Sequence, residues 1–116
     1  MHFSIERQGQ ALVASLVGEF DLHSAPKFKQ SMAEVFAEYP QLKHLILDVQ
    51  KVSFIDSSGL GVILGRYREI EEKGGRLFFV RANPQIKRIL QLSGFEKISE
   101  FANSTEEVLA WIRGQL

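Results

Sequence analysis

The sequence predicts an α/β fold with a mixed sheet, whose interior strands are largely parallel and are packed with about four helices. Two observations lead to this prediction. A nearly continuous apolar run over residues 42–49 is typical of a strand buried on both faces. From residue 24 onward, segments with apolar residues at helical spacing alternate with short β-prone segments, which favours parallel strands joined by helical crossovers.

Length and composition limit the possible functions. The chain has 116 residues, and we expect residues 1–116 to form one domain. Its 14 basic and 14 acidic residues balance, which argues against direct binding to nucleic acid or to an anionic membrane. The absence of cysteine excludes disulfides, thiol catalysis and thiolate metal sites. Since no apolar run approaches the roughly 18 residues of a membrane span, we expect a cytoplasmic protein.

The first 40 residues predict a β-hairpin followed by a helix. Apolar and polar residues alternate over residues 3–7, and an extended pattern resumes over residues 11–17 after a glycine-containing turn. Ser24 stands where a helix N-cap is expected, and Pro26 falls in the first turn. Apolar residues then share one helical face as far as Pro40.

The second half of the chain predicts further alternating elements. A helix following residue 56 should end at the glycine pair of residues 74–75, and a strand should follow over residues 76–81. Asn83 and Pro84 predict the start of another helix, and we expect a short strand near residues 97–99. Residues 104–107 have the pattern of a capping box for a last helix. The apolar face expected of this helix comprises Val108, Leu109, Trp111, Ile112 and Leu116.

The junction between the strand before residue 56 and the helix after it is the most informative part of the chain. Asp56, Ser57 and Ser58 fall at the first turn of that helix, where backbone N–H groups lack partners and the helix dipole is positive. The commonest use of such residues is a helix cap. A phosphate is also favoured there, and phosphorylation of a serine would add about −1.5 to −2 charges to the surface. Because functional loops gather at the carboxyl ends of strands, residues 18–24 should bring Asp21 close.

Three glycines follow the serines in this helix. The spacing of Gly59, Gly61 and Gly65 departs from that of a dinucleotide-binding loop, so we expect them to allow close approach to the sheet or to a partner. Leu60 continues the apolar stripe of the helix and is expected in the core, although its place near the turn also suits a contact residue.

Catalytic and metal-binding alternatives find little support. The segment around Ser58 lacks the Gly-x-Ser-x-Gly elbow of hydrolases, and the three histidines are spread over the N-terminus, a loop and a strand start. Potential metal ligands do not show helical i, i+3 or i, i+4 spacing. We therefore predict no enzyme activity, no metal and no cofactor. A regulatory domain that holds a nucleotide or small anion with the same loops stays open.

Several motifs together resemble the STAS domain over essentially the whole chain, and in particular its single-domain members, the anti-sigma factor antagonists. They are the Gly-Glu-Phe-Asp sequence of residues 18–21, the Asp-Ser-Ser-Gly-Leu-Gly turn of residues 56–61, the glycine pair of residues 74–75, and residues 83–84 and 92–95. Residues 61–67 resemble most the antagonists that act in sporulation. An antagonist for a stress-response sigma factor is the nearest alternative.

The resemblance implies a partner-switching regulator. In such a module the unphosphorylated antagonist binds an anti-sigma factor that is also a serine kinase, and thereby releases the sigma factor. The kinase inactivates the antagonist by phosphorylating the second serine of the Asp-Ser-Ser-Gly motif, which is Ser58 here, and a serine phosphatase restores it. Asp21 matches the acidic residue of a loop near the phosphosite, and Ser24 stands where the family usually has threonine.

From the resemblance and the expected edge of the sheet together, we expect one partner-binding surface. It comprises Asp21, Ser24, Asp56, Ser57, Ser58, Gly59, Leu60 and Gly61. A phosphate on Ser58 would lie near two carboxylates of this surface, and the resulting repulsion should oppose binding.

Overall fold

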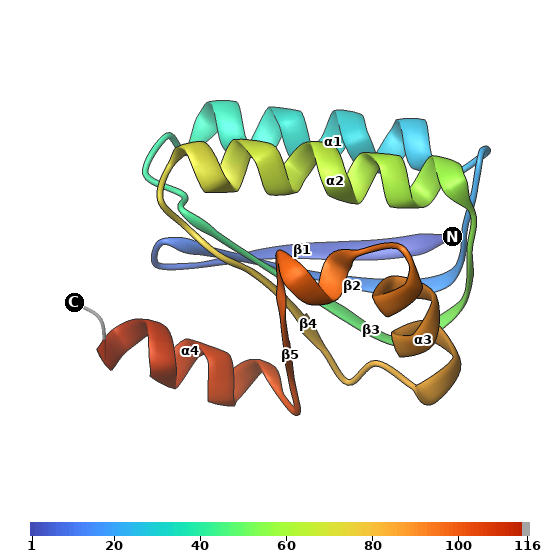
Figure 1. Cartoon of the computed structure of the whole chain (residues 1–116). Helices are drawn as coiled ribbons and strands as arrows, with labels where there is room; N and C mark the ends of the chain where they lie inside the picture. Colours follow the sequence, from blue (N-terminus) through green and yellow to red (C-terminus); the bar gives the residue numbers. More distant parts are fainter. Residues whose placement is uncertain (115–116) are drawn as a thin grey trace.

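The computed structural model describes residues 1–114 and contains a five-stranded sheet in the order β1-β2-β3-β4-β5 (Figure 1). The described strands are β1 (His2–Gln8), β2 (Ala11–Phe20), β3 (His44–Ile55), β4 (Leu77–Val80) and β5 (Glu100–Ala102). The described helices are α1 (Ala25–Glu38), α2 (Ser57–Glu72), α3 (Pro84–Leu92), α4 (Thr105–Gly114) and a short 3-10 helix, η1 (Phe95–Lys97). The predicted order of strands and helices is confirmed.

The sheet is mixed, as predicted. β1 pairs antiparallel with β2 through a turn in which Gly9 has a φ of +61°, so the expected hairpin is present. All later neighbours, β2 with β3, β3 with β4 and β4 with β5, are parallel. Parallel strands place their carboxyl ends at one edge of the sheet, and the loops that follow β2 and β3 therefore lie together.

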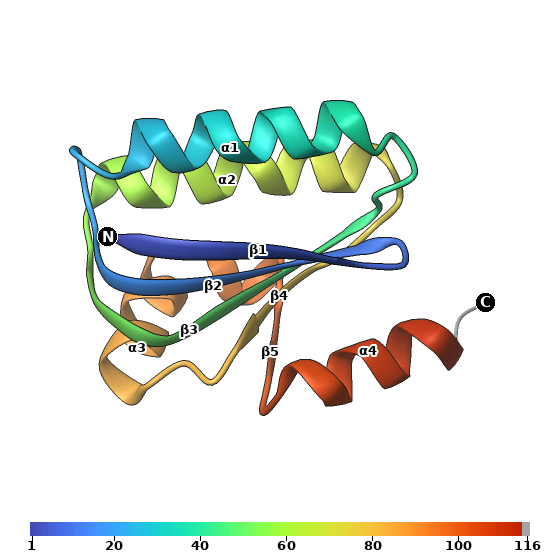
Figure 2. The same ribbon diagram turned by 180° about the vertical axis from the view of Figure 1, so that it is seen from behind.

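The two faces of the sheet are covered unequally. α1 and α2 lie side by side on one face, where α3 also contributes to the main core (Figures 1 and 2). This core contains fully buried Phe20, Phe28, Met32, Ile63, Ile70 and Phe79, each of which stabilises the fold by about 1.5–3 kcal/mol when removed from water. On the other face α4 packs over a smaller apolar cluster near the β1–β2 turn. No helix within residues 1–114 covers the rest of that face (Figure 2).

One predicted strand is displaced along the chain. The short strand expected near residues 97–99 is present but its predicted position is wrong, because η1 occupies residues 95–97 and β5 begins only at Glu100. Gly94 adopts a left-handed conformation with φ +90°, which ends α3 and turns the chain. Phe95 is then buried edge-on against Phe79, at 5.7 Å between ring centroids. Because Phe95 is anchored in the core, the chain rejoins the sheet only at Glu100.

The last helix begins at the predicted position. The Ser104 hydroxyl accepts a hydrogen bond from the Glu107 N–H at 3.1 Å, which is the serine half of the predicted capping box. Val108 and Ile112 are buried, and Trp111 stays partly exposed while its ring packs edge-on against Phe78. Leu116, expected on the same face, lies outside the described residues.

Candidate functional site

Asp56 caps α2 at the end of β3. Its backbone is extended, and its carboxylate oxygen Oδ1 accepts hydrogen bonds from the N–H groups of Ser58 at 2.8 Å and Gly59 at 3.1 Å. The predicted helix cap is therefore confirmed, with Asp56 as the capping residue and Ser57 and Ser58 as the first two helical residues. Two of the amides that could have bound an anion at this helix start are already occupied by the protein's own carboxylate.

The second oxygen of Asp56 joins this turn to the loop after β2. Oδ2 accepts a hydrogen bond from the Leu22 N–H at 3.1 Å, and the Asp56 N–H donates to the carbonyl oxygen of Phe20 at 3.1 Å. The pairing of β2 with β3 ends beside these contacts, where Phe20 faces Ile55. The expectation that residues 18–24 share this edge is confirmed.

Asp21 is held inside its own loop. Its Oδ1 atom accepts hydrogen bonds from the N–H groups of His23 at 3.0 Å and Ser24 at 3.1 Å. The pKa of the Asp21 carboxyl lies below its ordinary value. The hydrogen bond from the Ser24 N–H makes the largest contribution to this decrease, and partial desolvation opposes it. Asp21 therefore adds a fixed negative charge to the edge that also carries Asp56.

Ser24 has a different role from the predicted one. It occupies the N-cap position of α1, but its hydroxyl makes no hydrogen bond to a helix amide. The hydroxyl instead accepts from the Asp21 N–H at 2.9 Å and donates to the carbonyl oxygen of Glu19 at 3.0 Å. One reason is that Pro26 lies in the first turn and has no N–H to offer. Ser24 therefore stabilises the loop through these hydrogen bonds. The prediction that its side chain caps α1 is wrong.

The two serine hydroxyls are available for chemistry. Ser57 is exposed and Ser58 is half-buried, and within residues 1–114 neither side-chain oxygen takes part in a hydrogen bond. Leu60 is also half-buried and packs against the core, while Gly61 is exposed. A protein partner could therefore reach Ser57, Ser58 and Gly61 from solvent.

The glycines of α2 differ in what surrounds them. A Cβ at Gly59 would lie 2.6 Å from the Phe20 carbonyl oxygen and 2.8 Å from Phe20 Cδ1, so the expected close approach to the sheet is confirmed there. At Gly61 and Gly65 a Cβ would meet no atom within 4 Å, so the predicted close approach to the sheet is wrong for these two glycines. They leave an open strip along α2 that begins close to Ser58 in the sequence.

Leu22 is a surface residue that the sequence analysis did not single out. Its side chain is 66% exposed, although its N–H is bonded to Asp56. The available signal in the sequence was a large apolar residue between Asp21 and His23 in an otherwise polar loop. It adds an apolar group to the edge that carries Ser58.

His44 is placed too far from Ser58 to act as its general base. His44 begins β3 whereas Ser58 follows its end, and a strand of 12 residues spans roughly 40 Å. His44 is also buried, with its Nδ1 atom accepting the Arg76 N–H at 3.0 Å. Residues 1–114 contain no cluster of three metal-ligating side chains, and none of their helices has both the length and the apolar character for a bilayer crossing.

A cavity of about 410 Å³ borders the Asp21 loop on the side of β1 and α1. Glu19 and Asp21 contribute carboxylates to its wall, and Lys27 contributes an ammonium group. Because two carboxylates lie beside one lysine ammonium group, these three side chains give no excess of positive charge to attract a nucleotide or another anion. The alternative of an anion-binding domain that uses these loops gains no support from its charge.

Comparisons with known proteins agree with the fold. The STAS domain model matches residues 2–108. An anti-sigma F factor antagonist of Paenibacillus polymyxa is 38% identical over 98 residues, which cover 84% of this chain and 83% of that protein. An anti-sigma-B factor antagonist of Listeria monocytogenes is 30% identical over 114 residues, covering 93% and 96% of the two chains.

Solved structures show the same architecture. The anti-sigma factor antagonist SpoIIAA in its unphosphorylated form has a TM-score of 0.80 at 27% identity, and 97% of this chain and 99% of that chain are covered. The phosphorylated form of SpoIIAA from Bacillus has a TM-score of 0.77 at 28% identity, with 96% and 99% covered. The chain therefore belongs to the STAS domain family, and anti-sigma factor antagonists are among its homologues.

Proposed function

We propose that this protein is an anti-sigma factor antagonist in a partner-switching module. The unphosphorylated form binds an anti-sigma factor that is also a serine kinase, and so releases a sporulation sigma factor. The kinase phosphorylates Ser58 and thereby ends the interaction, and a serine phosphatase reverses this step. The family supports the regulatory class, and the 38% identity to an anti-sigma F factor antagonist favours sporulation.

One observation supports the phosphoserine switch most directly. The carboxylate of Asp56 already accepts the N–H groups of Ser58 and Gly59, so these helix amides are not free to neutralise a phosphate on Ser58. The phosphate would instead remain a doubly charged surface group beside the carboxylate of Asp56, in a loop region that also carries Asp21.

The proposed binding surface combines this charge sensitivity with apolar contact area. It comprises Asp21, Leu22, Ser24, Asp56, Ser57, Ser58, Gly59, Leu60 and Gly61. Exposed Leu22 offers an apolar contact, and the open strip at Gly61 lets a partner approach the α2 backbone. Burying an unmatched phosphate in such an interface costs several kcal/mol, and about 3 kcal/mol weakens an affinity roughly 100-fold.

Phosphate mapping tests the proposed site. The protein is incubated with ATP and the candidate anti-sigma kinase, and intact-mass spectrometry with fragmentation locates any phosphate. We expect one phosphate on Ser58 and none in the Ser58→Ala variant, while Ser57→Ala remains a substrate. A phosphate that maps to Ser57, or its absence while a control substrate is phosphorylated, would contradict the proposal.

A stress-response pathway is the second candidate, favoured by the 30% identity to an anti-sigma-B factor antagonist over 93% of the chain. Parallel binding measurements with an anti-sigma F and an anti-sigma-B factor separate the two pathways. Tighter binding to the first is expected from the higher identity, and tighter binding to the second would assign the protein to stress response.

A further inference from the structure

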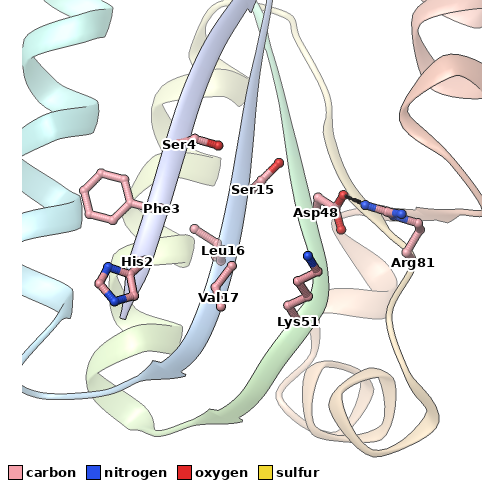
Figure 3. Close-up of a pocket in the computed structure, with 9 residues that line it drawn as sticks. All are labelled: His2, Phe3, Ser4, Ser15, Leu16, Val17, Asp48, Lys51 and Arg81. Atoms are coloured by element: carbon pink, nitrogen blue, oxygen red, sulfur yellow. Dashed lines mark hydrogen bonds and ion pairs between the residues drawn. The ribbon is translucent and has the colours of Figure 1, made fainter.

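A groove lies on the face of the sheet opposite α1 and α2, beyond the part that α4 covers. Its volume is about 400 Å³, within the range of small-molecule sites. The polar residues that line it are His2 and Ser4 from β1, Ser15 from β2, Asp48 and Lys51 from β3, and Arg81 after β4. Figure 3 shows these side chains on three neighbouring strands and, for Arg81, on the loop that follows β4. The groove is therefore distinct from the edge that carries Ser58.

A β-bulge brings Lys51 into the groove. Ser15 faces Asp48 and Val17 faces Lys51, so one residue of β2 is matched by two residues of β3 between these pairs. In a regular strand, residues three apart point to opposite faces, but the bulge places both Asp48 and Lys51 along the same groove. The Asp48 Oδ1 atom accepts the Gln50 N–H at 3.1 Å, which stabilises the bulge.

An ion pair between Asp48 and Arg81 forms the wall of the groove on the side away from β1. Asp48 is only 7% exposed, and its Oδ2 atom accepts from Arg81 Nε at 3.1 Å and also from Nη2 (Figure 3). Among residues 1–114, Arg81 is the one non-glycine residue with a positive φ, +57°. This uncommon conformation holds the guanidinium over Asp48 and leaves the Arg81 side chain 47% exposed.

Several groups in the groove keep unused hydrogen-bonding capacity. Ser4 and Ser15 face each other across β1 and β2, and within the described residues neither hydroxyl has a hydrogen-bond partner. Among residues 1–114, no carboxylate oxygen lies within 4.0 Å of the Lys51 ammonium nitrogen. Since Asp48 is paired with Arg81, Lys51 supplies an uncompensated positive charge to the groove that the two serines also line.

We propose that this groove binds a small organic anion. Its carboxylate or phosphate group would contact the ammonium group of Lys51 and the exposed edge of the Arg81 guanidinium, which are donors suited to either anion. Polar groups of the ligand body would bond to the hydroxyls of Ser4 and Ser15. The exposed side chain of Val17 supplies an apolar floor.

Titrations followed by backbone amide chemical shifts test this site. Inorganic phosphate and acetate are added separately to the full chain at constant ionic strength. We expect saturable shifts at Ser15, Val17 and Lys51 with a dissociation constant on the order of 1–10 mM. Saturation by phosphate alone supports a phosphorylated ligand, and saturation by acetate alone a carboxylate. If neither anion gives saturable shifts at these residues, the proposal is wrong.

Matched variants separate a specific site from general charge attraction. Lys51→Gln should raise the dissociation constant at least about 10-fold, whereas Lys29→Gln, an exposed charge on α1, should leave it unchanged. Ser15→Ala, which retains the charge, should weaken binding without abolishing it. Equal weakening by Lys51→Gln and Lys29→Gln would overturn the proposal, as would unchanged binding in both Lys51→Gln and Ser15→Ala.

Discussion

At each end of β3, a side chain accepts a hydrogen bond from a backbone N–H of a neighbouring segment, but one of these side chains is buried and the other is partly exposed. At its start, buried His44 accepts the Arg76 N–H that precedes β4. After its end, Asp56 accepts the Leu22 N–H that follows β2 and also caps α2. The first acceptor is neutral and covered by Phe78, whereas the second is charged and lies among exposed groups. The same backbone contact is therefore made once within the core and once at the edge that a partner can reach.

The close contact at the Asp56 end should be the most sensitive to mutation. Gly59→Ala would place a Cβ 2.6 Å from the Phe20 carbonyl oxygen, so α2 or β2 must shift. We expect a loss of about 2–3 kcal/mol in the free energy of unfolding, measured by urea denaturation. Gly61→Ala is the matched control, because its Cβ meets open space and alanine favours a helix by up to about 1 kcal/mol. Similar losses in both variants would contradict the structure.

Removal of the Asp56 carboxylate should have the next largest effect. Asp56→Ala deletes the acceptor for three backbone N–H groups, those of Leu22, Ser58 and Gly59. We expect about 1–2 kcal/mol of destabilisation, together with faster hydrogen exchange in residues 21–24. Asp56→Asn keeps oxygen acceptor capacity and should lose less. Unchanged exchange in this loop would show that Asp56 does not join the two segments.

The His44 end should make the stability of the protein depend on pH. Burial, followed by the charges of Lys43 and Arg76, holds the pKa of His44 below its ordinary value of 6.5. As the pH falls below about 6.5, the unfolded chain gains a proton that the folded protein resists, so stability should decrease. Urea denaturation between pH 7 and pH 5 measures this loss, and a His44→Gln variant should show a flatter profile. An equally steep profile would assign the pH dependence to another group.

The smallest effect is expected at Ser24, which braces the loop without capping a helix. Ser24→Ala removes the bonds to Asp21 and Glu19 but no bond to α1. We expect less than about 1 kcal/mol of destabilisation, with faster amide exchange confined to Asp21 and its neighbours. Faster exchange in the first turn of α1 would instead identify Ser24 as the cap that the sequence predicts.

Local patterns predicted most of the fold and the two loops of the candidate site. The Asp-Ser-Ser turn between a β-prone segment and a helical one determined the position of the α2 cap, because capping depends on neighbouring residues. Parallel strand order then implied that Asp21 lies at the same edge. The resemblance added the role of Ser58, which remains a proposal, as does the single-domain extent of residues 1–116.

The features that were missed depend on contacts between distant segments. β5 begins later than expected because Phe95 is anchored against Phe79. Ser24 bonds into its loop because the backbone from Glu19 to Asp21 curls around it. The orientation of Lys51 depends on a bulge between two strands, and the spacing of residues in β3 alone would have placed it on the other face.

In the proposed function, charge on Ser58 controls binding at the Asp56 end of β3. The most direct test is isothermal titration of the anti-sigma kinase with the unphosphorylated protein and with protein phosphorylated stoichiometrically at Ser58. We predict that the phosphate weakens the affinity by at least about 100-fold, which corresponds to roughly 3 kcal/mol. Equal affinities for the two forms would contradict the claim.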